Sequence, residues 1–551
     1  MNPAILSLAL ALVLPSAVLS SVAAKAEILP AIGEGWFGPY PQADYRPETG
    51  ACRDCRVIPQ ALWYFQGEAI AVPRAGVPMA KGAPGKPVAL EASGLRLPDD
   101  PAKDPRTPLI WLGSALVVPE ARLDDAGSMV SIDGKVMPFA YVPRLRTNLS
   151  WRDETTDAFF AGRAVRLRGE MERGSDGAER FVARTVWPKD FVLDPSASMR
   201  PLAAGESLET LVSAQDGDGA RASFSTRVLW SRHPGAPIGG ASVVGFMLNG
   251  AQGDDDEAHG GHFGVATGRW EPDGDMSSWL VNNFYGLDSY GEKGILAAAT
   301  PMDKYLADLN NGQSYYRPSS MLVAVFRTDR AARAYQGAMG GIYDRFYRHD
   351  LVYDHARSNC SGISVDAFRG LGWNVPDGGT ESLAKRIGAY GYVLGTTGSP
   401  GDARKIYDYF SAERSRLYPA SAFVAMGGDL LAMAEGRLGR EPTDFERGMA
   451  EDLVAIVHVA IPQLPSDRAW GRASVFSFDE YMRRTPADRS KWKIIPVDPK
   501  PFPASLRDAD TPVPEKPFPL PLPVGLTLVG LFSAIAVGIR FVIRRRSAGK
   551  A

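Results

Sequence analysis

The feature that most constrains the fold is the stretch from residue 254 to residue 373, which opens on a histidine-containing segment and closes on a cysteine-containing one. The residues after His262 are small or apolar and predict a short strand. The apolar residues after Cys360 recur at helical spacing and predict a short amphipathic helix. The stretch therefore supplies a histidine on a strand and a cysteine on a helix, the residue types of a base and a thiol nucleophile.

Neighbouring segments predict an α+β domain over residues 201–398. Residues 262–270 and 278–285 are expected to form a hairpin around Glu271-Pro-Asp-Gly274. Apolar residues at helical spacing predict a helix over 329–348, ahead of the helix that begins at Cys360. Three further strands are expected at 223–230, 241–248 and 321–327.

Cys360 stands where a thiol can be activated. A helix N-terminus and a neighbouring imidazole both lower a thiol pKa, and the thiolate is the nucleophilic form. Ser358 or Asn359 is a natural N-cap for the predicted helix. The backbone amides of its first turn are also available to stabilise an oxyanion.

His262 is the candidate base, and a third polar group usually orients such a histidine through its other ring nitrogen. The neighbouring strand of the hairpin carries Asn282 and Asn283, of which one should share a face with His262. The turn length decides which, so both stay candidates. His349 and His355 flank the loop before Cys360 and can approach it, although Arg-His-Asp around His349 is typical of a solvated turn.

At these residues the chain resembles the circularly permuted branch of the NlpC/P60 papain-like superfamily, which includes the lecithin–retinol acyltransferase-like proteins. That branch has a His-aromatic-Gly strand first and an Asn-Cys helix later, matched here by His262-Phe263-Gly264 and Asn359-Cys360. The resemblance covers roughly residues 220–375, less than a third of the chain. It implies a thiol nucleophile at Cys360 and a base at His262, acting on amide or ester bonds of peptides or lipids. The long segment between the motifs leaves room for an insertion.

Two other interpretations are open. Asp254–Asp256 with His259 and His262 could ligate a divalent metal, as in a metal-dependent hydrolase. Gly260 and Gly261 argue against a helix that presents both histidines on one face, and we expect no metal and no other cofactor; His259 could instead line the thiol site. In the other interpretation, the chain is a non-catalytic membrane-anchored envelope scaffold, whose papain-like fold is inert.

Both ends of the chain carry export or membrane signals. Residues 1–26 resemble a signal peptide with a small-x-small cleavage site at its end. Residues 524–543 are apolar apart from Thr527, Ser533 and Arg540 and predict a transmembrane helix. It follows a proline-rich stalk at 494–523 and precedes a basic cytoplasmic tail at 544–551. The bulk of the protein is therefore expected in the periplasm or outside the cell, although the C-terminal segment also resembles a processed bacterial sorting tail.

The region before the central stretch is expected to be rich in strands. Residues 27–56 are predicted to be a loop segment with a local disulfide between Cys52 and Cys55. Residues 57–200 are predicted to form a β-rich domain, and one hypothesis is an oligosaccharide-binding type of barrel. Expected strands in it are 61–65, 108–113, 137–142 and a hairpin of 163–170 with 181–187.

The region after the central stretch is expected to be helical. Residues 399–493 form this helical region, in which Thr443 and Glu446 make a capping box ahead of a helix over 449–459. This prediction places His458 in a helix. The expected fold class is thus α+β, with an N-terminal β-rich domain, a central permuted papain-like domain, a C-terminal helical region and one transmembrane helix.

The length and the net charge of the chain limit the functions that it can have. A chain of 551 residues suggests two or three domains. Its formal net charge of −2, without a basic tract outside the C-terminus, makes nucleic acid an unsuitable partner. The sequence therefore predicts an envelope cysteine hydrolase or acyltransferase whose substrate is a peptide, peptidoglycan or a lipid.

Overall fold

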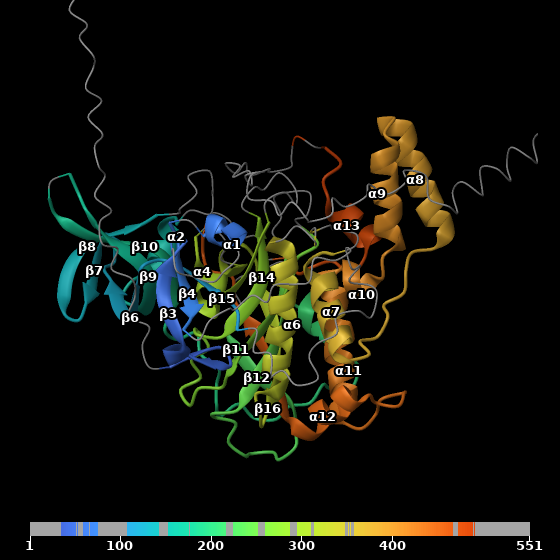
Figure 1. Cartoon of the computed structure of the whole chain (residues 1–551), viewed down its shortest axis with the longest axis horizontal. Coiled ribbons are helices and arrows are strands. Elements are labelled where there is room, and N and C mark those ends of the chain that lie inside the picture. The colour runs from blue at the N-terminus through green and yellow to red at the C-terminus, as the bar shows by residue number, and fades with distance from the viewer. Residues whose placement is uncertain are drawn as a thin grey trace, which may run out of the picture.

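The computed structural model describes most of the chain between Gly35 and Ser490. The described residues are 35–50, 52, 59–65, 67–74, 107–142, 152–175, 177–215, 224–251, 259–286, 295–309, 313–347, 351, 353, 358–466, 472–488 and 490. They form one large sheet, a closed barrel beside it and a group of helices on the opposite side (Figure 1).

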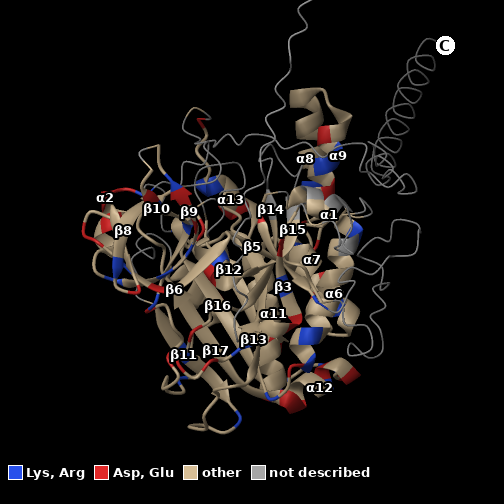
Figure 2. Cartoon of the chain, turned by 60° about the vertical axis from the view of Figure 1, so that its left-hand side comes forward, with Lys and Arg blue, Asp and Glu red and all other residues tan. Residues whose placement is uncertain are grey.

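The centre of the molecule is a sheet of 10 strands in the order β11-β17-β16-β12-β13-β14-β15-β5-β4-β3. Every residue of β12 and β16 is buried, so the middle of the sheet is covered on both faces. Lys, Arg, Asp and Glu lie mostly outside these central strands (Figure 2). The strands are β3 (Tyr45–Thr49), β4 (Ala69–Pro73), β5 (Ile110–Gly113), β11 (Ser225–Ser231), β12 (Ser242–Asn249), β13 (His262–Arg269), β14 (Leu280–Gly286), β15 (Ile295–Pro301), β16 (Ser319–Phe326) and β17 (Leu453–Ile461).

One face of this sheet, the helical face, is covered by α6 (Arg330–Tyr347), α7 (Cys360–Leu371) and α11 (Pro419–Ala434). Val265 and Phe246 are directly paired between β13 and β12 and therefore point to the same face. The Phe246 ring lies 5.7 Å from the Phe368 ring of α7. Aromatic packing thus fixes α7 against the middle strands.

The other face, the barrel face, is covered by the short helix α4 (Met302–Ala307), which also contacts the barrel strand β10. A Cβ atom on Gly264 would lie 3.1 Å from the hydroxyl of Tyr305, so β13 and α4 approach closely there. Gly264 alternates with Val265 along the strand, which places α4 on the face opposite to α7.

The barrel closes in the order β10-β8-β7-β6-β9, with β8 and β10 parallel. The oligosaccharide-binding type of barrel, which also has five strands, stays a hypothesis for this region. Val130, Phe139, Leu167 and Phe181 are buried in it. Its elements are β6 (Leu116–Leu123), β7 (Met129–Ile132), β8 (Lys135–Tyr141), α2 (Glu154–Phe160), β9 (Ala164–Arg173) and β10 (Glu179–Pro188).

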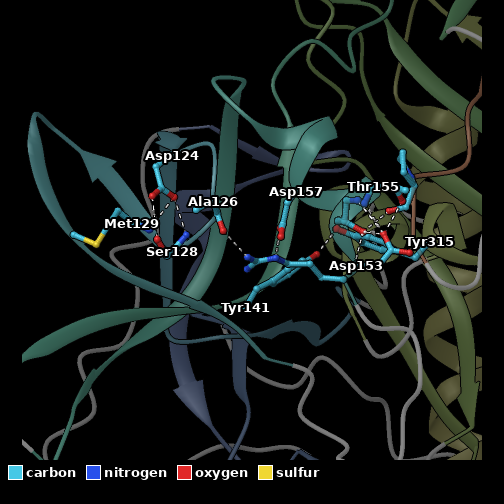
Figure 3. A network of polar contacts seen from close by, with 12 residues as sticks. Asp124, Ala126, Ser128, Met129, Tyr141, Asp153, Thr155, Asp157 and Tyr315 are labelled. Carbon is cyan, nitrogen blue, oxygen red and sulfur yellow. Dashed lines mark hydrogen bonds and ion pairs between the residues drawn. The ribbon is translucent and has the colours of Figure 1, made fainter.

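Polar contacts brace the barrel and join it to the rest of the molecule (Figure 3). The Asp124 carboxylate accepts hydrogen bonds from the backbone N–H groups of Ser128, at 2.7 Å, and Met129, at 3.0 Å, which closes the β6–β7 turn. The Tyr141 hydroxyl is hydrogen-bonded to that of Tyr315 in α5 (Gln313–Tyr316). The barrel is therefore tied to the segment that leads into β16.

The two expected hairpins are confirmed, and so is the expected helix over 329–348. β13 pairs antiparallel with β14, β9 pairs antiparallel with β10, and α6 follows the predicted helical spacing. The expected strand at 61–65 is wrong, because these residues belong to the helix α1 (Pro59–Tyr64) and the turn after it. A short apolar run has no periodicity that separates a buried strand from a buried helix.

The expected helix over 449–459 is also wrong in its second half. The Thr443–Glu446 capping box is confirmed at the start of α12 (Asp444–Asp452), but the chain then enters β17. β17 lies between β16 and β11, so a strand from late in the chain completes the sheet. Its β-branched residues favour a strand over a continued helix.

Smaller elements complete the described residues. Figure 1 shows α8 (Leu383–Thr397) and α9 (Pro400–Ser411) as a helical hairpin that stands out from the body. The others are β1 (Trp36–Phe37), β2 (Tyr40–Pro41), η1 (Gln42–Asp44), α3 (Leu208–Ser213), α10 (Arg414–Leu417) and α13 (Phe478–Arg484).

The fold class needs one correction, because a transmembrane helix was expected. Within the residues that the structure describes, no helix is both long and apolar enough to cross a membrane. The segment 524–543 lies outside those residues, as do the predicted signal peptide, the proline-rich stalk and the basic tail. The described fold is α+β, with a mixed sheet and a barrel.

Candidate functional site

Cys360 is the first residue of α7, and the structure assigns its N-cap. Asn359, not Ser358, caps the helix: its Oδ1 accepts a hydrogen bond of 2.7 Å from the Gly362 N–H. The Asn359 Nδ2 donates to the Leu417 carbonyl at 3.0 Å, which ties the start of the helix to α10. Cys360 is buried, with 7% of its surface exposed, and carries a thiol.

The surroundings of Cys360 locate it at one end of the sheet. Its backbone N–H donates to the Tyr353 hydroxyl at 3.3 Å, and its Sγ lies 4.0 Å from the Ser361 Oγ. The Tyr353 ring lies 5.9 Å from the ring of Phe284, near the end of β14. Cys360 is therefore at the end of the sheet where β13 begins and β14 ends. An oxyanion would compete with Tyr353 for the Cys360 N–H.

His262 and Asn283 are brought together. The His262 Nε2 is hydrogen-bonded to the Asn283 Oδ1, which also accepts the Phe284 backbone N–H at 2.8 Å. Because a backbone N–H can only donate, the amide oxygen is the atom that faces the histidine. Nε2 then carries the ring proton in the neutral imidazole, and Nδ1 is the nitrogen able to accept one.

Asn282 has a different role. Its side chain exchanges hydrogen bonds with the Gln336 amide, at 2.7 and 3.2 Å, and donates to the Tyr343 hydroxyl at 3.1 Å. Both partners belong to α6 on the helical face. Asn282 therefore connects β14 to α6, and Asn283 is the asparagine that contacts His262.

The two halves of the predicted pair lie on different faces of the sheet. Val265 points to the helical face, so strand alternation directs His262 to the barrel face. Cys360 belongs to α7 on the helical face. Both residues are at the same end of the sheet, so their side chains can meet only around the start of β13.

His262 has neighbours that sequence reasoning missed. The Tyr305 ring of α4 lies 6.4 Å from the imidazole, and the Tyr305 hydroxyl donates to Asn249 Oδ1. Asn249 is directly paired with His262 and donates to the Ser319 Oγ at 2.8 Å. Asn249 ends an apolar strand and Tyr305 follows 43 positions after His262, and nothing local in the sequence marks either residue.

In the part of the chain that the structure describes, no three His, Cys, Asp or Glu side chains are grouped so that they could hold a metal ion. The metal-site interpretation therefore has no support among these residues. Asp254–Asp256 lie outside that part. The His259 ring packs at 5.5 Å against Tyr481, and its carbonyl accepts the Val475 N–H at 3.0 Å. His259 thus packs against α13, and its backbone is fixed by the segment before that helix.

His458 is buried in β17, not in a helix. Burial lowers its pKa to about 4, and the nearby Arg227 guanidinium acts in the same direction, whereas Glu206 opposes them. The imidazole is therefore neutral near pH 7. Cys52 is disulfide-bonded, and its predicted partner, Cys55, lies outside the described residues.

Comparison with known proteins adds no assignment: no family model, no curated protein and no solved structure matches the chain. The case for function therefore depends on the geometry of Cys360, His262 and Asn283.

Proposed function

We propose that the protein is an exported cysteine hydrolase or acyltransferase, with Cys360 as nucleophile and His262 as base. The observation that carries the proposal is the location of a capped thiol helix and an oriented histidine at the same end of one sheet. A capped helix N-terminus favours the thiolate, and the bond to Asn283 leaves Nδ1 as the proton acceptor.

The proposed reaction begins with transfer of the Cys360 thiol proton to Nδ1 of His262, directly or through one water at the start of β13. The thiolate attacks an amide or ester carbonyl, and the C–N or C–O bond breaks as the leaving group takes a proton from the imidazolium. Water or an acceptor nucleophile then attacks the acyl-enzyme, giving up its proton to His262. This step releases the acyl product and restores the thiol.

The substrate class follows from the compartment. The disulfide at Cys52 fits an oxidising environment outside the cytoplasm. Peptides, peptidoglycan and lipids are the amide- and ester-containing molecules present there, and each is a candidate substrate of the proposed activity.

A non-catalytic scaffold is the second candidate, and one observation favours it. Strand alternation directs His262 away from α7, and its neighbours Asn249 and Tyr305 belong to a network of buried hydrogen bonds. A histidine in such a network can serve packing alone. If the protein is a scaffold, Cys360 is expected never to carry an acyl group.

Trapping of the acyl-enzyme separates the two candidates. The unreduced protein would be incubated with p-nitrophenyl acetate and analysed by intact and peptide mass spectrometry. The proposed enzyme acquires one acetyl group on the peptide that contains Cys360, and acetylation at this peptide is lost in Cys360→Ser and strongly reduced in His262→Ala. Acetylation that is equal in wild type and Cys360→Ser would contradict the proposal.

A further inference from the structure

The short helix α4 connects the barrel to the surroundings of His262. All six of its residues are buried, between the barrel strand β10 and the sheet strands β14 and β15. Two residues of this helix, two positions apart, make contacts on different sides: Asp303 contacts the barrel, and Tyr305 contacts His262.

The contact with the barrel is a buried ion cluster. The Asp303 carboxylate accepts hydrogen bonds of 2.8 and 2.9 Å from Arg168 Nε and of 2.8 Å from Arg166 Nε, both on β9. Burial raises the pKa of Asp303, but the two guanidinium groups outweigh burial and hold that pKa below its usual value. Asp303 is therefore a carboxylate whose position the barrel fixes.

A second ion pair holds the same segment. The Lys304 ammonium lies 3.0 Å from Asp308 Oδ2 and 3.8 Å from the centre of the Trp111 ring on β5. The Leu309 N–H donates to the carbonyl of Arg184 on β10 at 2.9 Å. The helix is therefore tied to the barrel at its start, by Asp303, and just after its end, by Leu309.

Tyr305 contacts the surroundings of His262 through both its ring and its hydroxyl. The Tyr305 ring packs against the imidazole of His262, and its hydroxyl holds Asn249, the residue paired with His262 across the sheet. The Asn283 bond restrains His262 from one side and Tyr305 from another. The direction of the imidazole thus depends on where α4 lies.

We infer that Tyr305 is a positioning residue for His262, and that the barrel is part of the same functional unit because its arginines fix α4 through Asp303. The inference rests on the proposed function for its catalytic meaning. It accounts for a barrel packed against the sheet, with charged groups buried at the junction.

The test is the titration and tautomer of His262, measured by 15N-histidine NMR on the full chain and assigned with His262→Gln. Tyr305→Leu leaves space beside the imidazole that water can fill, and water favours the imidazolium, so the pKa of His262 rises by about 0.5 or more. Arg166→Gln weakens the hold on Asp303 while Arg168 stays, and it gives a smaller rise of the same sign. Both variants reduce the share of the Nε2–H tautomer.

Glu172→Gln is the matched control, because it removes an exposed barrel ion pair with Arg180 that does not contact α4. It leaves the His262 titration unchanged. If Tyr305→Leu does not fold, Arg166→Gln decides. An unchanged pKa and tautomer of His262 in every folded variant of Tyr305 and Arg166 would overturn the inference. Acylation of Cys360 is measured separately, so an inert thiol with a coupled His262 refutes the proposed function but not the positioning.

Discussion

The two faces of the sheet are joined to their covering layers in different ways. On the helical face, α7 meets the sheet through aromatic rings such as Phe246, Phe368 and Trp373, and its buried ion pair, Asp366 with Arg416, joins it to α10 rather than to the sheet. On the barrel face, α4 is held by buried ions and directed hydrogen bonds. Shape complementarity tolerates small displacements, whereas a buried charge tolerates none without its partner. The barrel face, which carries His262, is therefore the face whose link to its covering layer depends on buried charge.

The largest effect is expected from a substitution in the buried ion cluster on the barrel face. Asp303→Ala leaves Arg168 and Arg166 without their buried carboxylate and lowers the free energy of unfolding by about 3–5 kcal/mol. Urea unfolding followed by circular dichroism measures this change. Glu172→Ala, at an exposed pair, changes stability by less than about 1 kcal/mol. Equal effects of the two substitutions would show that the buried cluster has no special role.

The second prediction concerns the pH dependence of stability. His458 is paired with Leu322 and therefore points to the helical face. Its pKa is lowered to about 4 in the fold, so the unfolded chain binds the proton more tightly. The contribution of His458 to the free energy of unfolding is therefore complete above the unfolded pKa of about 6.5. This contribution is lost as the pH drops toward 4, which lowers the free energy of unfolding by up to about 3 kcal/mol. His458→Gln removes this component of the acid sensitivity. An unchanged pH profile of urea unfolding in this variant would contradict the assignment.

The third prediction compares the two asparagines directly. Asn282→Ala and Asn283→Ala each remove buried hydrogen bonds and lower stability by about 1–3 kcal/mol. Only Asn283→Ala releases the His262 ring, so only this variant changes the His262 tautomer in 15N NMR. A change of similar size in Asn282→Ala would mean that the face assignment from strand pairing is wrong.

The smallest expected effect concerns the cap of α7. Asn359→Ala loses the hydrogen bonds to Gly362 and to the Leu417 carbonyl and lowers stability by about 1–2 kcal/mol. It also slows alkylation of Cys360, because the first turn of the helix loosens. Ser382→Ala removes the N-cap of α8, away from the site, and lowers stability by about 1 kcal/mol. If both variants slow alkylation equally, the effect is not local to Cys360.

Local features of the fold could be predicted from the sequence, and distant pairings could not. The β13–β14 hairpin, α6, α7 and the Thr443 capping box all depend on residues close in sequence. The position of β17 in the sheet depends on β11 and β16, which are far away in the chain. Strands β3, β4 and β5 likewise join the edge of the central sheet, by pairings that no local pattern in the N-terminal region marks.

The same division applies to the candidate site. Cys360 and His262 were marked by the residues beside them, and the choice between Asn282 and Asn283 needed the observed pairing of Val265 with Asn282. Tyr305 was missed because its contact with His262 depends on the path of the chain after β15. The face of His262 relative to α7 also follows only from the assembled sheet.

The most direct test of the central claim is the pH dependence of iodoacetamide labelling at Cys360. In unreduced protein the disulfide-bonded Cys52 does not react, and Cys360→Ser supplies the background. The account predicts an apparent thiol pKa well below about 8.5 that rises in His262→Ala and is unchanged in His355→Ala. A thiol that stays unreactive, or whose pKa is indifferent to His262, would contradict the account and leave the scaffold in its place.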